Sequence, residues 1–269
     1  MENIKENKIA LLIDADNAQA ELIKNILAEA GKHGKVTIRR IYGNWTDNRL
    51  GSWKTQINTH SIRPVQKFSL GQGKNSTDTA MIIDAMDILH SKNVTGFCIA
   101  SSDSDYTGLA QRIREEGIFV MGIGEANKTA EAFVNACDLF VFTENLSGDT
   151  NDNSDKQSKV KPQKTAKQTE KQVEKIDLPI NKITKEPIDI NNILKAFDMV
   201  VDDNSLAYMG EMGTALRKLD PSFDSRTYGS ATMTSLFKRL PDLFELVYKD
   251  KGSSLYLKLK DRNEKNTSS

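Results

Sequence analysis

Runs of apolar residues alternate with stretches of helical periodicity along the first half of the chain. Uninterrupted runs such as Ile9–Ile13 and Phe97–Ala100 are typical of strands buried on both faces of a parallel sheet. We expect strands at 9–13, 36–42, 97–100, 118–121 and 139–142, and helices at 17–30, 45–59, 76–89, 106–116 and between the last two strands. This alternation predicts an α/β domain in which helices sandwich a parallel sheet.

The pattern changes after residue 146. Residues 147–186 are rich in Lys, Gln and Thr and contain few large apolar side chains, so they cannot bury enough surface to offset the entropy of ordering. We interpret them as a flexible linker. Its lysines are an alternative contact for RNA, but the interspersed Glu170 and Glu174 favour plain solvation.

Helical periodicity returns from about residue 187. An apolar stripe from Ile190 to Val201 predicts one helix, and two more are expected at 206–219 and 232–240. Two strands, 243–248 and 255–259, flank a turn at 250–253. Three helices followed by a hairpin predict a small α+β winged-helix domain. The expected organisation is a first domain at 7–146, the linker at 147–186, a second domain at 187–260 and a disordered tail at 261–269.

Charge and composition exclude some classes of protein. The 37 basic and 37 acidic residues balance, so any surface for nucleic acid must be local. No apolar segment approaches the roughly 20 residues that cross a bilayer, and the N-terminus has no apolar signal core, so we expect a cytoplasmic protein without membrane contact. Cys98 and Cys137 lie in apolar stretches and are expected to be core residues in a reducing compartment.

Four aspartates occupy positions where side chains would converge. Asp14 ends the first strand run, and Asp103 and Asp105 directly follow the run at 97–100. The carboxyl ends of parallel strands meet at one edge of a sheet, where ligands bind. Asp78, in the first turn of the 76–89 helix, is a fourth candidate. Crowded carboxylates repel one another unless a hard divalent cation lies between them, so the cluster predicts a metal site.

Each acidic position also has a structural interpretation. Asp103 and Asp105 are typical helix-capping residues, Asp78 suits the dipole of its helix, and Asp16 or Asn17 is suited to cap the next helix. The two glycine-containing loops that resemble nucleotide-binding motifs lack required positions, so no nucleotide cofactor is expected. The three histidines are scattered and are expected on the surface.

Cations and aromatic residues lie in segments neighbouring the aspartates. Such a mixture suits a single-stranded nucleic acid, which offers phosphates and base faces. Trp53 is at least as well explained as a core residue, so Trp45 is the better binding candidate. The residues expected to contact a nucleic acid here are Arg39, Asn44, Trp45, Lys67 and Lys74.

The acidic motifs together resemble a known family. Asp14-x-x-Asn17, Lys74-x-x-x-Asp78 and the run Ser102–Tyr106 resemble the NYN domain, a branch of the PIN-like nucleases. The runs Gly122–Glu125 and Ala136–Phe140 are similar to bacterial LabA-like members. Residues 187–260 resemble the LOTUS domain, also called OST-HTH.

The resemblance implies a ribonuclease that depends on Mg²⁺ or Mn²⁺. Asp14, Asp78, Asp103 and Asp105 would be metal ligands, assisted by Asn17, and the bound ion would activate an attacking water. The LOTUS-like domain would bind RNA or a protein partner. Its candidate phosphate contacts are Lys238, Arg239, Lys249, Lys251 and Lys258.

Two alternatives remain open at this point. The chain would be a catalytically silent RNA-binding module, or a regulatory scaffold whose LOTUS-like domain recruits a protein. Four filled acidic positions argue against the first, because a binder gains nothing from carboxylates beside phosphates. Single-stranded RNA is the favoured substrate, DNA is not excluded, and the sequence leaves the oligomeric state open.

Overall fold

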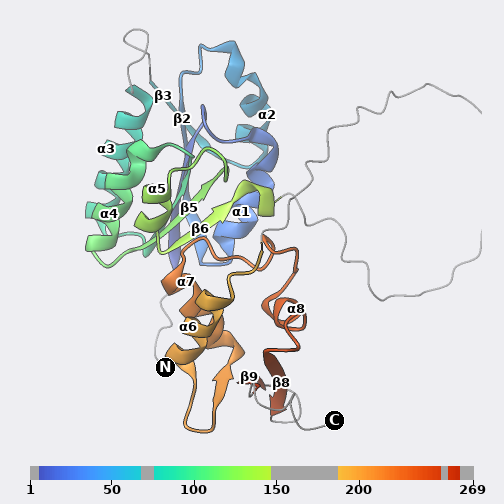
Figure 1. Ribbon diagram of the computed structural model, residues 1–269. Helices are drawn as coiled ribbons and strands as arrows, with labels where there is room; N and C mark the ends of the chain where they lie inside the picture. The colour runs from blue at the N-terminus through green and yellow to red at the C-terminus, as the bar shows by residue number, and fades with distance from the viewer. Residues whose placement is uncertain (1–5, 68–75, 147–186, 250–253, 261–269) are drawn as a thin grey trace, which may run out of the picture.

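A six-stranded parallel sheet forms the centre of the first domain (Figure 1). Its strand order is β3-β2-β1-β4-β5-β6, so the chain reverses direction across the sheet between β1 and β4. The strands are β1 (Lys8–Asp14), β2 (Lys35–Gly43), β3 (Arg63–Gln66), β4 (Gly96–Ala100), β5 (Phe119–Gly124) and β6 (Leu139–Phe142). The structure, a computed structural model, describes residues 6–67, 76–146, 187–249 and 254–260.

Helices cover both faces of this sheet, as predicted. Residues Ala10 and Leu12 of β1 face one core and Leu11 and Ile13 face the other, because side chains alternate along a strand. One face packs against α3 (Ser76–Ser91), α4 (Thr107–Glu115) and α5 (Glu131–Ala136). The other packs against α1 (Ile23–Gly31) and α2 (Trp53–Thr59). Figure 1 shows the two layers on opposite sides of the strands.

Some local predictions for the first domain differ from the structure. The helix expected at 17–30 starts later, as a 3-10 turn at Ala20–Leu22 that leads into α1. The helix expected at 45–59 is a 3-10 turn (Asn48–Ser52) followed by α2, and Gly51 lies at this weak point. Strand β3 was not predicted. It is short and contains Pro64, features that are tolerated because β3 is an edge strand.

In its described residues, the second domain contains three helices and a three-stranded antiparallel sheet of order β7-β9-β8, which confirms the winged-helix prediction. Its elements are α6 (Ile190–Val200), β7 (Leu206–Tyr208), α7 (Met209–Leu219), α8 (Met233–Phe237), β8 (Phe244–Lys249) and β9 (Ser254–Leu259). The prediction of a helix beginning at Leu206 was wrong. Residues 206–208 form β7, because Ala207 is buried opposite Leu257 of β9.

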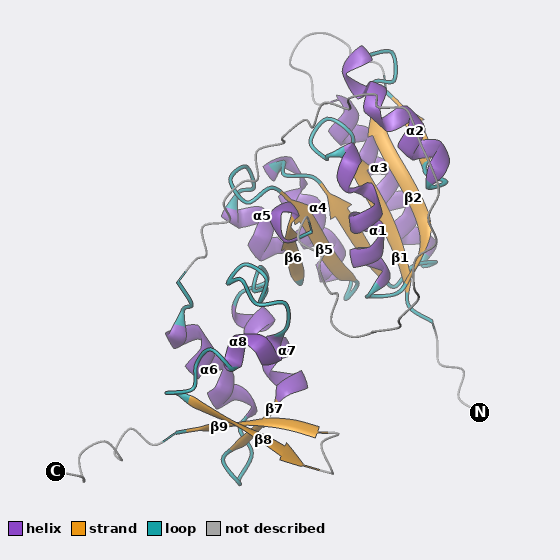
Figure 2. Ribbon diagram, turned by 90° about the vertical axis from the view of Figure 1, so that its right-hand side faces the viewer, coloured by secondary structure: helices purple, strands orange, loops and turns teal. Residues whose placement is uncertain are grey.

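The second domain contacts the first along strand β6 and helix α1. The Phe140 amide of β6 donates to the Pro221 carbonyl at 2.8 Å, which pairs an otherwise open sheet edge. Asn145 Nδ2 donates to Thr227 Oγ1 at 2.8 Å. Figure 2 shows α7 and α8 on the side of the second domain nearest the first, with its small sheet on the far side.

The predictions on the cysteines, on membrane spans and on the linker have different outcomes. Cys98 and Cys137 are buried, reduced core residues, as predicted. Within the described ranges, no helix combines the length and apolar character that a bilayer crossing requires. The predicted linker at 147–186, the turn at 250–253 and the tail at 261–269 lie outside the described residues.

Candidate functional site

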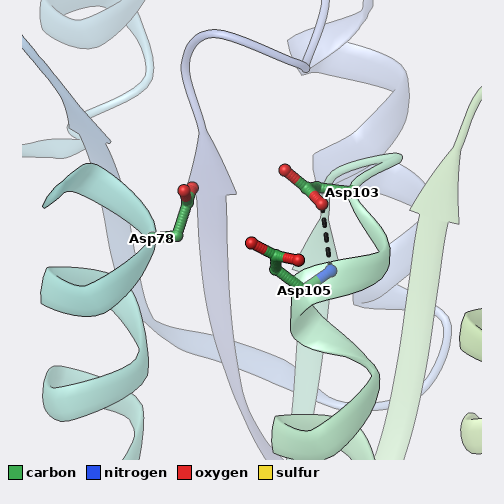
Figure 3. A group of neighbouring side chains, drawn as sticks. All are labelled: Asp78, Asp103 and Asp105. Carbon is green, nitrogen blue, oxygen red and sulfur yellow. Dashed lines mark hydrogen bonds between the residues drawn. The ribbon is translucent and has the colours of Figure 1, made fainter. Parts of the chain in front are cut away.

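Three aspartate carboxylates converge at the carboxyl edge of the six-stranded sheet. Asp78 extends from the first turn of α3, while Asp103 and Asp105 lie in the segment that leaves β4. One carboxylate oxygen of each lies within 4.8 Å of those of the other two. Figure 3 shows the three side chains directed toward a shared space between α3 and this segment. The site therefore lies beside the point where the sheet reverses its strand order, where open α/β sheets bind ligands.

Local hydrogen bonds hold the segment after β4 in this shape. Asp103 caps the 3-10 turn Ser104–Tyr106, because its Oδ1 accepts from the Asp105 amide at 2.9 Å (dashed in Figure 3). The Asp103 amide in turn donates to Ser101 Oγ at 3.1 Å. The structural interpretation of Asp103 as a cap is therefore confirmed. The same cap places the Asp103 carboxylate beside that of Asp105, so capping and clustering occur together.

Asp14 lies at the carboxyl end of β1 and is almost fully buried, with 1% of its surface exposed. Its carboxylate accepts hydrogen bonds from Asn17 Nδ2 at 2.7 Å, Ser101 Oγ at 2.9 Å and the Asp16 amide at 3.1 Å. Burial raises the pKa of Asp14, these hydrogen bonds lower it, and the nearby charge of Asp78 raises it. The charge of Asp78 therefore acts on Asp14, but Asp14 is not one of the three mutually adjacent carboxylates.

The three carboxylates repel one another, as expected of crowded acidic groups. Burial raises the pKa of Asp78 first, and the charges of Asp103 and Asp105 raise it further. The Tyr106 hydroxyl opposes these effects by donating to Asp78 Oδ1 at 2.8 Å. Tyr106 is itself fully buried, and burial together with the charges of Asp14 and Asp78 raises its pKa.

This donor set fits a hard divalent cation. It consists only of carboxylate oxygens, which Mg²⁺ and Mn²⁺ prefer, and two of the three side chains come from a hydrogen-bonded turn. The oxygens lie within 4.8 Å of one another, and opposed ligands about 2.0–2.1 Å from one small ion are about 4.2 Å apart, so the side chains would need to close by only about half an ångström to share the ion. A cation would also relieve the repulsion that raises the pKa of Asp78.

Some of the residues expected to contact a nucleic acid lie at this edge, and one does not. Asn44 and Trp45 follow β2, and Lys67 follows β3, so all three lie at the same carboxyl edge as Asp14. The Trp45 indole is half-buried and donates to the Val65 carbonyl at 3.1 Å. Arg39 lies within β2 and donates to the His60 carbonyl at 3.0 Å, away from this edge.

Trp53 is buried, with 2% exposure, and its indole donates to the Ala15 carbonyl, which confirms its interpretation as a core residue. Lys74 and Lys251, two of the expected nucleic-acid contacts, lie outside the described residues.

The basic side chains of the second domain differ in whether they are free at the surface to contact a phosphate. Lys238 and Lys258 are exposed. Lys249 is exposed and lies 4.8 Å from the ring centre of Tyr256, a cation–π contact. Arg239 is bound within its own domain, because its guanidinium donates to the Tyr228 carbonyl and to Ser230 Oγ. Lys238, Lys249 and Lys258 therefore offer charge at the surface, whereas Arg239 stabilises a loop.

Sequence reasoning did not give Ser101 or Tyr106 a role in the site. Ser101 bridges Asp14 and the Asp103 amide, and Tyr106 fixes Asp78. Their signal in the sequence is position alone, since both belong to the short run that follows β4. Asp84, on α3 with Asp78, instead pairs with Arg40 and accepts from the Tyr42 hydroxyl.

Comparison with known proteins identifies both domains. The model of the NYN domain matches residues 8–147. The chain belongs to the NYN domain family. The model of the OST-HTH/LOTUS domain matches residues 181–256. The NYN domain is part of the PIN-like nuclease superfamily, and OST-HTH/LOTUS domains are known for RNA binding.

Two solved structures that are similar to this NYN protein are described as being of unknown function or uncharacterized. A crystal structure of a protein of unknown function from Vibrio parahaemolyticus is 20% identical, with a TM-score of 0.45, and the match covers 53% of this chain and 96% of that one. A solution NMR structure of an uncharacterized protein from Nitrosomonas europaea is 32% identical, with a TM-score of 0.27, over 39% of this chain and 92% of that one. No protein of curated function matches.

Proposed function

We propose that this NYN protein is a ribonuclease that depends on Mg²⁺ or Mn²⁺ and hydrolyses phosphodiester bonds of single-stranded RNA. The observation that carries the proposal is the convergence of Asp78, Asp103 and Asp105 at the edge of the sheet where its strand order reverses. This group lies in a domain of a nuclease superfamily, joined to a domain of an RNA-binding type.

The chain's own residues would have separate tasks in this reaction. Asp78, Asp103 and Asp105 would hold the ion, and Tyr106 would fix Asp78. Asp14, held in place by hydrogen bonds from Asn17 and Ser101, would add negative charge beside the ion site. A bound Mg²⁺ or Mn²⁺ would supply Lewis-acid stabilisation of the negative charge that develops on the phosphodiester.

The RNA strand would approach along the carboxyl edge of the sheet. Asn44, Trp45 and Lys67 lie there and offer an amide, a half-buried aromatic ring and a cation. In the second domain, Lys238, Lys249 and Lys258 offer charge for further contacts with phosphates or with a protein partner. The preference for RNA over DNA rests on the OST-HTH/LOTUS domain.

Cleavage of labelled single-stranded RNA in Mg²⁺, Mn²⁺ or EDTA tests the proposal, with single-stranded DNA as a parallel substrate. Wild type and Asp87→Asn should cut RNA in either metal and not in EDTA, whereas Asp103→Asn and Asp105→Asn should not cut. Asp87 is the matched control because it is exposed on the same helix as Asp78, outside the three-carboxylate group.

Asp14→Asn is a weaker test, because it alters a buried hydrogen-bonded carboxylate and so affects folding as well. Folded wild type that binds RNA without cutting it in any metal would contradict the proposal. It would instead support the catalytically silent RNA-binding scaffold.

A further inference from the structure

A cleft of about 600 Å³ lies between the two domains, at the opposite end of the sheet from the aspartates. Its walls come from the amino ends of β5 and β6 and from the last turn of α7. Among the described residues, the arginines, lysines and carboxylates that line it are Arg114, Arg217, Lys218 and Asp138. His33, predicted to be on the surface, is half-buried here, with its ring centre 5.3 Å from that of Phe119.

The one carboxylate of the cleft already has a structural partner. Asp138 Oδ2 accepts from the Val120 amide at 2.8 Å, so it is held against the backbone of β5. Arg114 donates from one nitrogen to the Asn135 carbonyl at 2.9 Å, which anchors its guanidinium at the rim and leaves its other N–H groups for a ligand. The cleft therefore has an excess of positive charge and of hydrogen-bond donors.

Arg217, which comes from α7 and lines this cleft, is half-buried. No ion pair within 4.0 Å involves Arg217 in the part of the chain that the structure describes. Burial lowers the pKa of Arg217, and Asp224 only partly opposes this effect. A guanidinium stays protonated in proteins, so its burial without a close partner is a cost that a bound anion would offset.

Asp224, whose charge acts on Arg217, is paired with a different arginine. Arg226 binds Asp224, with a shortest contact of 2.6 Å, and also reaches Glu29 across the domain boundary at 3.2 Å. Glu29 is bound by Lys32 as well, at 2.8 Å. The Arg226–Glu29 contact joins the two domains, and both acidic groups already have a cation within 3.2 Å, whereas Arg217 lines the cleft with no carboxylate within 4.0 Å among the described residues.

We propose that this interdomain cleft is an anion site that takes a phosphate group, either from the backbone of a bound RNA strand or from a free nucleotide. Guanidinium groups match phosphate oxygens in a bidentate way, and Arg217 and Arg114 come from different domains. A phosphate between them would bridge the docked domains. The RNA source rests on the proposed function, whereas the nucleotide source does not.

The test measures binding of the full chain in EDTA, so that cleavage plays no part. The probes are a labelled single-stranded RNA, followed by fluorescence anisotropy, and AMP, followed by calorimetry. Arg217→Gln should weaken binding of at least one probe about tenfold, the loss expected for one charge-assisted hydrogen bond. For RNA, the slope of log affinity against log salt should also fall by about 1.

A second variant tests the same site if Arg217→Gln fails to fold. Arg114→Gln with Lys218→Gln changes only exposed side chains and should weaken the same probe. Arg112→Gln is the matched control, because Arg112 lies on the same helix but pairs with Glu116. Loss of RNA binding identifies the strand as the source, and loss of AMP binding identifies the nucleotide. Wild-type affinity for both probes in both cleft variants would overturn the proposal.

Failure of this proposal is distinguishable from failure of the ribonuclease proposal. The cleft variants leave Asp78, Asp103 and Asp105 intact, so metal-dependent cleavage is measured separately. A nuclease with wild-type binding in the cleft variants would contradict only the anion site.

Discussion

The two ends of the six-stranded sheet carry opposite charge and differ in how that charge is compensated. At the carboxyl end, Asp78, Asp103 and Asp105 lie close together, and Asp14 is buried at the end of β1. At the amino end, Arg114, Arg217 and Lys218 surround one carboxylate, and the second domain closes over them. The sheet thus places the acidic side chains and the basic side chains at opposite ends.

The two ends differ in which groups contact their charged side chains. At the acidic end, neutral donors such as Tyr106, Asn17 and Ser101 orient the carboxylates without neutralising them. At the basic end, Arg226 pairs with Asp224 and, across the domain boundary, with Glu29, while Arg217 has no ion pair within 4.0 Å in the described part of the chain. Charge that local structure does not neutralise is available to a ligand.

The largest expected effect comes from undocking the basic end. Glu29→Gln removes the buried carboxylate that joins α1 to Arg226, at a cost of about 3 kcal/mol to the docked state. Hydrogen exchange of the Phe140 amide, which is bonded across the boundary, should therefore accelerate about a hundredfold. Glu115→Gln is the control, because that side chain is 68% exposed in a surface pair. Equal exchange in both variants would show that the ion pair does not hold the domains.

The next effect tests the acidic end by metal binding alone. Wild type should gain about 2.7 kcal/mol of stability when the metal concentration is a hundred times its dissociation constant. The double variant Asp103→Asn, Asp105→Asn should gain none, because two of its three carboxylates are gone. Urea unfolding in Mn²⁺ and in EDTA measures both, and Asp87→Asn should behave as wild type. Stabilisation of the double variant by metal would place the ion elsewhere.

A smaller effect is expected from the residue that links the carboxylates. Ser101→Ala removes a buried hydroxyl that donates to Asp14 and accepts from the Asp103 amide, and it should cost about 2 kcal/mol of unfolding free energy. Ser104→Ala is the control, since Ser104 is an exposed neighbour in the same turn. Thermal unfolding compares the two. A cost below that of the control would mean that Ser101 does not support the site.

The smallest effect is a pH dependence of the metal-free protein. Burial and then the charges of Asp103 and Asp105 raise the pKa of Asp78 above the ordinary 3.8. The folded state therefore holds this proton to a higher pH than the unfolded chain, so the contribution of Asp78 to stability falls as pH rises from 3.8 through the folded pKa. Unfolding measured against pH in EDTA should show this fall in wild type and a flatter profile in Asp78→Asn. Parallel profiles would contradict it.

Much of the first domain was predictable, because buried parallel strands are continuous apolar runs. Strands β1, β4 and β6 were predicted within one or two residues for this reason. The edge strand β3 and the short β7 were missed, because their pairing depends on neighbours that are distant in sequence. Strand ends predicted that Asp14, Asp103 and Asp105 lie at one edge, and Asp78 was a further candidate from its helix; the separate, buried position of Asp14 did not follow from this pattern.

The sequence by itself determined the α/β alternation, the winged-helix pattern and the identity of the acidic residues, because these depend on local periodicity and on residue type. Only the tertiary structure decided which carboxylates share one space and that Arg217, in the described part of the chain, lines the cleft without a close ion pair. The Glu29–Arg226 pair joins residues 197 positions apart, and Tyr106 reaches Asp78 across 28. Contacts of this kind leave no periodic trace in the chain, since they arise only when separate elements pack together.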